Sequence, residues 1–328
     1  MIYKYRGCLL GLAIGDALGA PVEFLRLEEI KEKYGRDGIT DFHEWRGFKP
    51  GLYTDDTQMS LATADGCIRA SQRWRDKGIC HPASVVHRRY LGWLESQNNP
   101  EKRRCPGNTC LSALQSGEMG TIEKKINNSK GCGGVMRTAP AGLAFPSDRA
   151  FQEGAEFAAI THGHPSGYLS AGFLSALISY IIEGKILAEA IDICIKQLVK
   201  YKGHGETLEK IKLAHELSVG QKSVEELIKT IGEGWVGEEA LAISVYCSLR
   251  FSDNFEKGTL AAVNHSGDSD STGSITGAIL GTLLGVESIP GHWVRDVEES
   301  GRIKKIADDM FGIFRGGKKL SFEEYPPY

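Results

Sequence analysis

Two short acidic segments of this chain carry the same kinds of oxygen atoms, although most of the sequence separates them. The first is TDDT at residues 54–57 and the second is DSDST at residues 268–272. Each begins a run of apolar and small residues with helical periodicity, so its carboxylates and hydroxyls fall in a first helical turn. Such oxygens suit hard cations like Mg2+ or Mn2+ rather than Zn2+ or Cu2+. Together the segments predict an all-oxygen site for hard cations.

Helix capping is the simpler interpretation of each acidic segment taken alone. Thr54 can serve as an N-cap, and the helix dipole favours Asp55 and Asp56 in the first turn. Asp268 and Asp270 can likewise belong to a solvated turn that leads into a helix. Alternate acids in a tight turn can also direct two carboxylates at one point. The repetition of the same donors at two helix starts favours the metal site, while capping stays open for both.

A glycine-rich segment and two histidines are further candidates for ligand binding. In NNSKGCGGVMR, the glycines at 131, 133 and 134 precede a helix-like segment, and free backbone N–H groups there could hold a phosphate. The spacing matches neither the Walker pattern nor GxGxxG, so a plain turn is the alternative. His162 and His164 lack the further Cys or His neighbours of a Zn2+ site. A hydrogen-bonded loop histidine and a contact with a polar ligand both fit them.

Three other charged residues have structural explanations beside a functional one. Arg137 follows the glycine-rich segment and could pair with a phosphate or with a nearby acid. Glu238 and Glu239 begin a strongly apolar helix, where acids complement the helix dipole without any further role. No Ser-His-Asp or Cys-His nucleophile is supported by the sequence.

Helical periodicity dominates the chain, and strand-like alternation is scarce. Only the tail at 319–325 could form a short extended piece, and loops are expected near 36–53, 98–107 and 118–133. No linker rich in Pro, Gly or Ser divides the chain, which favours one all-α domain over residues 1–328. The periodicity predicts helices over residues 4–19, 55–76, 83–96, 108–116, 149–160, 167–183, 187–201, 206–218, 223–231, 236–250, 255–264, 271–285 and 301–313.

Glycines recur every four residues in two of these helices. Each glycine inside a helix costs about 1 kcal/mol relative to alanine, and a smooth glycine face lets another backbone approach closely. We expect the two stripes to pack on each other in antiparallel order, which would bring Glu23 near Asp268 and Asp270. Packing of each stripe against a different helix is the alternative. The stripes are Gly7, Gly11, Gly15 and Gly19, and Gly273, Gly277, Gly281 and Gly285.

The composition excludes several classes of protein. A net charge of -3 and a pI near 6.3 give no overall field that would attract nucleic acid or an anionic membrane. The eight cysteines form no CxxC pair, which favours free thiols in a reducing compartment. Asp16 breaks the N-terminal apolar run, and the runs near 170–182 and 274–286 are too short to span a bilayer. A cytoplasmic location is therefore expected.

Six motifs occur in an order that resembles the ADP-ribosylglycohydrolase family. They cover about residues 6–285, and the ordered set is far more specific than any one motif. The resemblance is closer to bacterial dinitrogenase-reductase-activating-type glycohydrolases than to macrodomains. It implies a compact all-α fold, an orthogonal bundle of many helices that residues 286–328 complete or decorate. The motifs are GLAIGDALGAPVEF, YTDDTQMSLA, GNTC, GCGGVMRTAPAGL, THGHPSGYLSAG and GDSDSTGSITGAILG.

The resemblance also implies a centre of two Mg2+ or Mn2+ ions. The residues that would hold the first ion are Thr54, Asp55, Asp56 and Asp270. Those that would hold the second are Asp268, Asp270, Ser271 and Glu23. The family usually has threonine where Ser271 stands, and serine keeps the hydroxyl ligand. One acid among Asp55, Asp56 and Glu23 would activate a water or protonate the leaving group.

A substrate-binding set follows from the same resemblance. Its members are Glu23, Gly131, Cys132, Gly133, Gly134, Met136 and His162. His162 matches a ribose-side histidine of the family, and the residues from Gly131 to Met136 match its ADP-ribose loop. The family often has asparagine where Cys132 stands, which puts the polar contact at that position in doubt.

The activity implied by the resemblance is hydrolysis of the N-glycosidic bond between ADP-ribose and an arginine of a modified protein. A hydrolase of another ADP-ribose linkage, to serine, nucleic acid or a small molecule, is one alternative. A second is an immunity protein that blocks an ADP-ribosyltransferase toxin by binding it. A third is a structural protein that reuses the fold, which the complete acidic set argues against.

Overall fold

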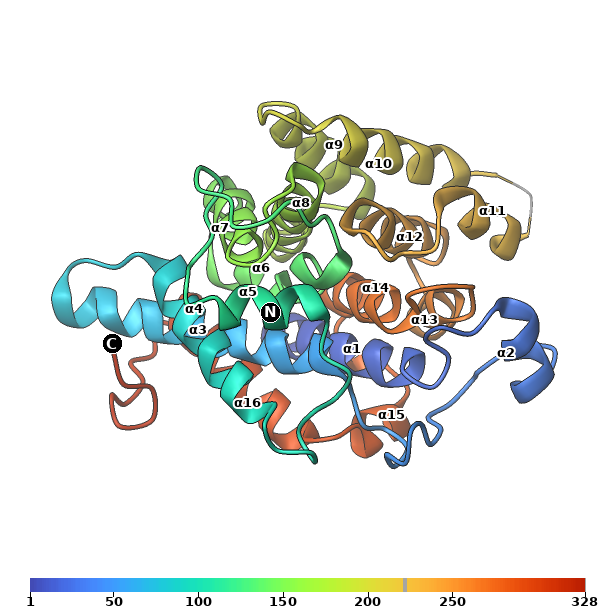
Figure 1. The fold of residues 1–328 in the computed structure, drawn as a ribbon, viewed down its shortest axis with the longest axis horizontal. Coiled ribbons are helices and arrows are strands. Elements are labelled where there is room, and N and C mark those ends of the chain that lie inside the picture. The colour runs from blue at the N-terminus through green and yellow to red at the C-terminus, as the bar shows by residue number, and fades with distance from the viewer. Residues whose placement is uncertain (221–222, 328) are drawn as a thin grey trace.

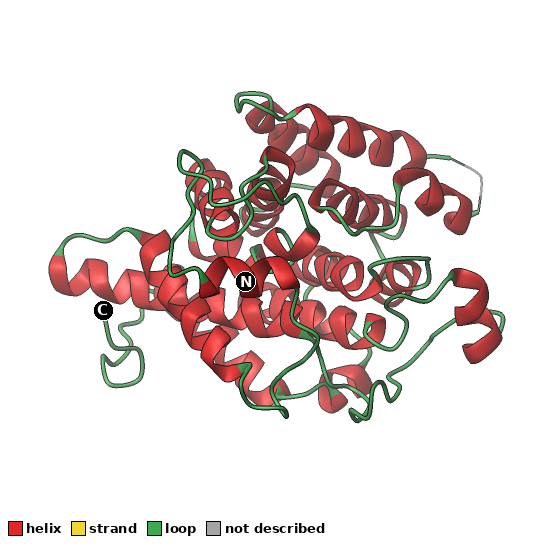
Figure 2. Cartoon of the chain, viewed as in Figure 1, coloured by secondary structure: helices red, strands yellow, loops and turns green. Residues whose placement is uncertain are grey.

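The structure is a computed structural model that describes residues 1–220 and 223–327. Its regular elements in this part of the chain are helices, joined by loops and by two isolated bridges, which confirms the all-α prediction (Figure 2). The helices are α1 (Ile2–Gly19), α2 (Leu27–Tyr34), α3 (Asp55–Lys77), α4 (Pro82–Ser96), α5 (Asn108–Gln115), η1 (Cys132–Gly134), α6 (Ala139–Ala144), α7 (Ser147–Ala159), α8 (Pro165–Ile182), α9 (Leu187–Leu198), α10 (Gly205–Ser218), α11 (Val224–Ile231), α12 (Gly237–Arg250), α13 (Phe255–Val263), α14 (Ser269–Leu284), η2 (Val286–Ser288), α15 (Gly291–Asp296) and α16 (Ser300–Phe314).

Each helix predicted from periodicity is present, with ends that move by a few residues at most. The α-helices that periodicity missed are α2, α6 and α15, which have 8, 6 and 6 residues. Two turns or fewer give too few repeats for a helical pattern to stand out from its surroundings. The tail at 319–325 is coil and turn rather than an extended strand, so that expectation was wrong.

Helices α1 and α14 lie side by side in the middle of the molecule, and the remaining helices pack around them (Figure 1). Helices α12 and α13 flank α14, while α3 and α16 contact the other side of α1. Helices α6, α7 and α8 pack on one another, and α9, α10 and α11 lie along the edge beyond α8 and α12. This arrangement places the start of α14 and the end of α1 deep inside the bundle.

The two glycine stripes are the contact between α1 and α14, in the antiparallel order that the sequence predicts. A Cβ atom added to Gly15 would lie 1.9 Å from the carbonyl oxygen of Gly273, and one added to Gly277 would lie 2.0 Å from that of Gly11. No real side chain fits at such distances. At the end of the stripe, a Cβ on Gly19 would lie 2.4 Å from the Cα atom of Asp270. The stripe therefore brings the end of α1 to the start of α14.

Among the described residues, α8 is the one helix whose length and apolar composition would allow it to cross a membrane. The sequence estimate that its apolar run is too short was therefore wrong, because the helix extends to 18 residues. However, 89% of that length is buried inside the protein, as is usual for a central core helix. All eight cysteines are free thiols, as their spacing predicted.

Substitution of Gly277 by alanine tests the backbone contact between α1 and α14. Overpacked cores lose about 1–3 kcal/mol or more, and here the new methyl group meets backbone that cannot turn away, so we expect a loss at or above the top of that range. Gly92, inside α4 with no atom within 4 Å of an added Cβ, is the matched control. Gly92→Ala should stabilise the protein by up to about 1 kcal/mol.

Urea denaturation of both variants measures these changes. Equal stability of Gly277→Ala and the unaltered protein would contradict the close approach of the two helices.

Candidate active site

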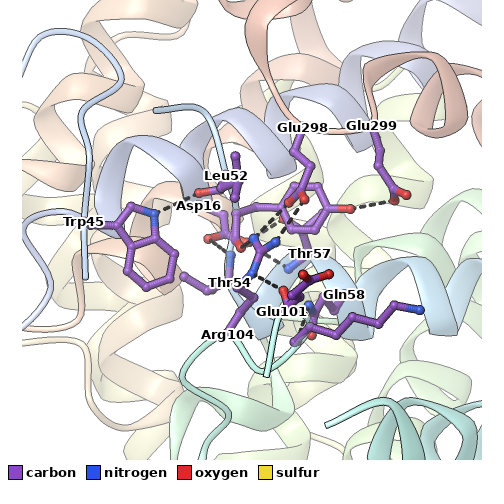
Figure 3. A network of polar contacts seen from close by, with 12 residues as sticks. Asp16, Trp45, Leu52, Thr54, Thr57, Gln58, Glu101, Arg104, Glu298 and Glu299 are labelled. Atoms are coloured by element: carbon purple, nitrogen blue, oxygen red, sulfur yellow. Dashed lines mark hydrogen bonds and ion pairs between the residues drawn. The ribbon is translucent and has the colours of Figure 1, made fainter. Parts of the chain in front are cut away.

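The first acidic segment begins α3, and an acid from α1 holds it in place. Asp16 is fully buried, and its Oδ1 accepts the backbone N–H of Thr54 at 2.9 Å (Figure 3). Its Oδ2 accepts the N–H of Thr57 at 2.9 Å and the Thr57 hydroxyl at 2.6 Å. Thr54 itself caps the helix, since its hydroxyl accepts the N–H of Asp56. The capping interpretation is thus correct for Thr54. Asp16 accepts further hydrogen bonds at the start of the helix, from the N–H groups of Thr54 and Thr57 and from the Thr57 hydroxyl.

Arg104 fixes the residues on either side of Thr54 from the opposite direction. Its guanidinium donates to the Tyr53 carbonyl at 3.2 Å and to both carboxylate oxygens of Glu298 at 3.1 Å (Figure 3). The Arg104 carbonyl accepts the N–H of Asp55, and the N–H of Gly107 donates to Asp55 Oδ2. These contacts orient Asp55 through both its backbone and its carboxylate. Sequence reasoning missed Arg104 because its partners lie far away in the chain.

The second acidic segment begins α14 and contacts the glycine-rich loop. Asp268 is the N-cap, and the N–H of Ser271 donates to Asp268 Oδ1 at 3.3 Å and to Asp270 Oδ1 at 2.9 Å. Burial first, then the charge of Asp268, raises the pKa of the Cys132 thiol well above its ordinary value. The protonated thiol donates to Asp268 Oδ2 at 2.6 Å. Cys132 therefore makes a polar contact where the family's asparagine is absent.

Six carboxyl groups from four segments influence one another at the meeting point of α1, α3 and α14. They are Asp16, Glu23, Asp55, Asp56, Asp268 and Asp270. Burial, followed by the charges of Asp270 and Asp268, raises the pKa of Glu23 to about 11. Burial and the charge of Asp270 raise the pKa of Asp16 to about 7. The effect of Asp268 and Asp270 on the pKa of Glu23 agrees with the predicted proximity of these residues.

These acids have no basic counter-ion among residues 1–220 and 223–327, since none forms an ion pair there with Lys, Arg or His. Asp56 Oδ2 is also buried without a hydrogen-bond partner. Several buried carboxyl groups without a basic counter-ion are costly to ionise, and a bound dication would compensate them. In the same residues no three Asp, Glu, His or Cys side chains are spaced as a ready metal site. The oxygen donors fit hard cations by their chemistry, although within the described residues they are not close enough to one another to coordinate one ion together.

The loop that carries Glu23 is joined to the glycine-rich loop by two aromatic rings. Phe24 adopts a left-handed backbone with φ of 69°, and its ring stacks on Trp235 with centroids 5.0 Å apart. The Trp235 carbonyl accepts the N–H of Cys132 at 3.1 Å. A non-glycine residue in the left-handed region is strained, so surrounding contacts must hold it there. The segment that carries the half-buried Glu23 is therefore tied to the loop at 131–134.

The glycine-rich loop is a 3₁₀ turn with less free backbone than the sequence suggested. The N–H of Cys132 is bonded to Trp235, and the N–H of Gly131 donates to Ser129 Oγ at 3.3 Å. Those two groups are not free to hold a phosphate as expected. The Met136 side chain, assigned to substrate binding by the resemblance, is 3% exposed and belongs to the core. A Cβ on Gly133 would lie 3.1 Å from the imidazole of His162, so that ring faces the loop.

Arg137 is fully buried behind the loop, and its contacts within the described residues are with neutral groups rather than with an acid. It donates to the Gly133 carbonyl at 2.6 Å and to Thr161 Oγ1 at 2.6 Å, and it lies 4.6 Å from the centroid of the Tyr90 ring. Burial and the charge of Arg137 lower the pKa of His162 to about 3, so its imidazole is neutral. The predicted pairing of Arg137 with an acid is absent from the described residues.

The other charged candidates have the structural roles that were their simpler interpretation. The His164 side chain caps α8 by accepting the N–H of Ser166. Glu238 and Glu239 begin α12 and pair with lysines, Glu238 with Lys130 at 2.6 Å. None of these three side chains joins the acidic group.

Comparison with known proteins identifies the family that these features belong to. The sequence profile of the ADP-ribosylglycohydrolase family matches residues 2–319. The chain belongs to this family. Its members are hydrolases that remove ADP-ribose from modified targets. The resemblance inferred from the six motifs is therefore confirmed.

Relatives of the chain extend over nearly its whole length. It is 28% identical over 315 residues to an ADP-ribosyl-[dinitrogen reductase] glycohydrolase of Rhodospirillum rubrum, covering 94% of this chain and 95% of that protein. It is 26% identical to the ADP-ribosylarginine hydrolase Tri1 of Serratia proteamaculans, covering 94% of this chain and 79% of the other. A solved structure described as an ADP-ribosylglycohydrolase-related protein complex superposes with a TM-score of 0.71 at 22% identity, covering 95% and 98% of the two chains. That last likeness supports the fold alone.

The position of Asp16 in the sequence is itself a sign of a buried structural role. It is the single charged residue after Arg6 in an otherwise apolar helix, and it interrupts the run between two glycines of the stripe. A lone acid on the buried face of a helix needs partners, and Asp16 finds them in α3. The tertiary contacts of Arg104 and Cys132 gave no comparable signal.

Replacement of single acids by asparagine distinguishes an acid that stabilises the fold from one that destabilises it and serves the site. Asp16→Asn should lower the stability of the metal-free protein by about 1–3 kcal/mol, because an amide NH2 would face backbone donors. Asp56→Asn should raise it by about 1 kcal/mol, because it removes an acid whose ionisation is opposed by burial and by its acidic neighbours and whose Oδ2 has no partner. Chemical denaturation in the presence of a chelator measures both, with the exposed Asp253→Asn as control.

Loss of stability in Asp56→Asn as large as that in Asp16→Asn would contradict this division of roles.

Proposed function

We propose that the protein is a binuclear-metal-dependent hydrolase that removes ADP-ribose from arginine side chains of modified proteins. The observation that carries the proposal is the buried group of six acids without a basic counter-ion, beside the glycine-rich loop and the neutral His162. The names of the relatives from Rhodospirillum rubrum and Serratia proteamaculans support ADP-ribosylated protein and ADP-ribosylarginine as substrates. The specific linkage and the metals are part of the proposal.

The residues that would hold two Mg2+ or Mn2+ ions come from the starts of α3 and α14. They are Thr54, Asp55, Asp56, Asp268, Asp270 and Ser271, with Glu23 at the edge. When bound, such ions would compensate the carboxylates, position ribose hydroxyls and make a water easier to deprotonate for attack on the anomeric carbon. The protein supplies a rigid frame, because Asp16 and Arg104 fix the start of α3 before any ligand arrives.

The reaction needs one group to accept a proton from water and another to protonate the leaving nitrogen. Water oxygen forms the new bond to the anomeric carbon, and the bond from that carbon to the guanidinium nitrogen breaks. Glu23 is the most accessible of the acids and has a strongly raised pKa, so we assign it the role of proton donor. Asp55 and Asp56 are the candidates for proton acceptor. Gly131 and Gly133 lie beside the imidazole of His162, and we assign these three residues to the ADP-ribose.

Release of ADP-ribose from an arginine-modified protein is the direct test. Asp56→Ala and Asp270→Ala should each reduce the rate at least about a hundredfold, because each would remove a ligand and a positioned charge. The unaltered protein should be active with Mg2+ or Mn2+ and inactive with chelator, and Asp253→Ala should match it. Chromatography of released ADP-ribose measures all of these.

Activity that survives both substitutions would contradict the assigned site. If the protein does not release ADP-ribose from arginine but does release it from serine, nucleic acid or a small molecule, that other linkage is its substrate. Protection against an ADP-ribosyltransferase toxin that persists in Asp56→Ala would favour a blocking role instead.

The stability of the metal-free protein should fall as the pH rises from about 5 to 8. The folded-state pKa values of Glu23 and Asp16, about 11 and 7, exceed the ordinary carboxyl values near 4. In this window the folded protein binds more protons than the unfolded chain, so the free energy of unfolding decreases with pH. Burial also raises the pKa of the proposed metal ligands Asp55, Asp56 and Asp268. Metal binding must displace their protons, so its stabilising effect should be larger at pH 8 than at pH 5.5.

Thermal melting at both pH values, with chelator and with Mn2+, measures these effects. A shift on metal addition that is equal at the two pH values would show that no protons are displaced.

A further inference from the structure

The contacts of Arg137 have a chemical consequence for His162. The chain from the guanidinium through Thr161 to the imidazole is buried throughout: Arg137 and Thr161 are 0% exposed and His162 is 1% exposed. Arg137 Nη2 donates to Thr161 Oγ1 at 2.6 Å, and Thr161 Oγ1 lies 2.8 Å from His162 Nδ1. A neutral imidazole carries one proton, and its position depends on the partner of the other nitrogen.

The direction of this chain follows from counting hydrogens. A guanidinium has only donors, so Thr161 Oγ1 must accept from Arg137, and Thr161 keeps a single proton to donate. The Cys110 sulfur also lies near this group and accepts from Arg137 Nη1 at 3.3 Å. Thiol sulfur is a weak acceptor compared with an imidazole nitrogen. A hydroxyl that already accepts from a cation is also a stronger donor, so the Thr161 proton goes to His162 Nδ1.

The remaining proton of the imidazole then lies on Nε2, which faces the glycine-rich loop. A Cβ on Gly131 would lie 3.5 Å from His162 Nε2, and one on Gly133 would lie 3.3 Å from it. Within residues 1–220 and 223–327, Nε2 has no hydrogen-bond partner of its own. Nε2 is thus a polar atom of a buried side chain that points at the loop and can form a hydrogen bond with a ligand.

We propose that Arg137 is a positioning residue that, through Thr161, fixes His162 as an Nε2–H donor towards the ligand side of the glycine-rich loop. The same guanidinium holds the Gly133 carbonyl, so loop and donor are set by one group. The matching ligand atoms are acceptors such as ribose hydroxyl or phosphate oxygens, an identification that rests on the proposed function. An imidazole with a bare Nε2 would present a lone pair to phosphate oxygen and oppose it.

The geometry also explains why an arginine stands at this position. Two of its nitrogens reach two different acceptors, the Gly133 carbonyl and the Thr161 hydroxyl. A lysine ammonium is a point charge and cannot occupy both positions at once. The contacts of the guanidinium in the described residues are with neutral groups and with the Tyr90 ring, so it is not explained as half of an ion pair.

Histidine 15N NMR of the free, chelator-treated protein tests the tautomer without substrate or metal. The unaltered protein should show His162 with a protonated Nε2 and a bare Nδ1, unchanged between about pH 5 and 8, since the pKa is about 3. Thr161→Val should shift the signals towards a mixture of tautomers, and Thr161→Ser should restore the original pattern. The signals of His162 are assigned by their loss in His162→Gln.

Binding of ADP-ribose to the same variants connects the tautomer with function. Loss of one hydrogen bond of about 1.4 kcal/mol corresponds to a tenfold change, so the Kd should rise about tenfold in Thr161→Val. Thr161→Ser should bind as the unaltered protein does, and Arg137→Lys should weaken binding. Thr276→Val is the matched control, because the Thr276 hydroxyl is buried without a partner.

A bare Nε2 in the unaltered protein would overturn the inference. So would a Thr161→Val variant that binds ADP-ribose weakly while its tautomer is unchanged, because the effect would then be structural. Failure of the unaltered protein to bind ADP-ribose would overturn the proposed function, whereas the NMR result would still decide the tautomer.

Discussion

The direct backbone contact between α1 and α14 is the constraint on which the rest of the structure depends. Because the two glycine stripes exclude side chains, the helices approach until the end of one touches the start of the other. That contact places Asp16 at the start of α3 and Glu23 beside the acids of α14. An ordinary helix pair, held apart by side chains at 8–10 Å, would separate these groups. The glycines therefore contribute to the site by the close approach of backbones that they allow.

The acidic group shows a conflict between stability and function. Its carboxylates are buried, raise one another's pKa and have no basic partner in the described part of the chain, so they oppose folding. The fold tolerates this because the backbone around them is fully engaged: Asp16 and Arg104 hold the start of α3, and Asp268 caps α14. Local strain of this kind is common at functional sites, where surrounding structure over-determines an unfavourable arrangement.

The fold could be predicted well from the sequence because its signals are local and repeated. Helical periodicity located the long helices, and the four-residue glycine spacing predicted both the partner of α1 and its direction. The short helices α2, α6 and α15 could not be predicted, since one or two turns carry little pattern. The prediction of an extended tail at 319–325 was wrong for a related reason, because alternation over a few residues is a weak signal without a neighbouring strand to pair with.

The residue types of the two acidic segments indicated candidate acids, but they did not indicate Asp16 or the other residues that hold these acids in place. Arg104 reaches Glu298, and Cys132 reaches Asp268, across large sequence separations that only the folded chain reveals. Of the two expectations for Arg137, the pairing with an acid was wrong, because its partners in the described residues are neutral groups inside the fold. Burial and a threonine partner are tertiary properties that residue type does not encode.

The glycine-rich loop lies between two buried and uncompensated charges of opposite sign. Cys132 contacts Asp268 on the acidic side, and the next residue, Gly133, accepts from the cation of Arg137. Each charge is costly alone, and the two do not neutralise each other, because no ion pair joins them. A ligand that lies along this loop meets acids at one end and a cationic background at the other. That polarity suits the ligand of the proposed function, ADP-ribose, whose diphosphate is an anion and whose ribose end would be bound through the proposed cations.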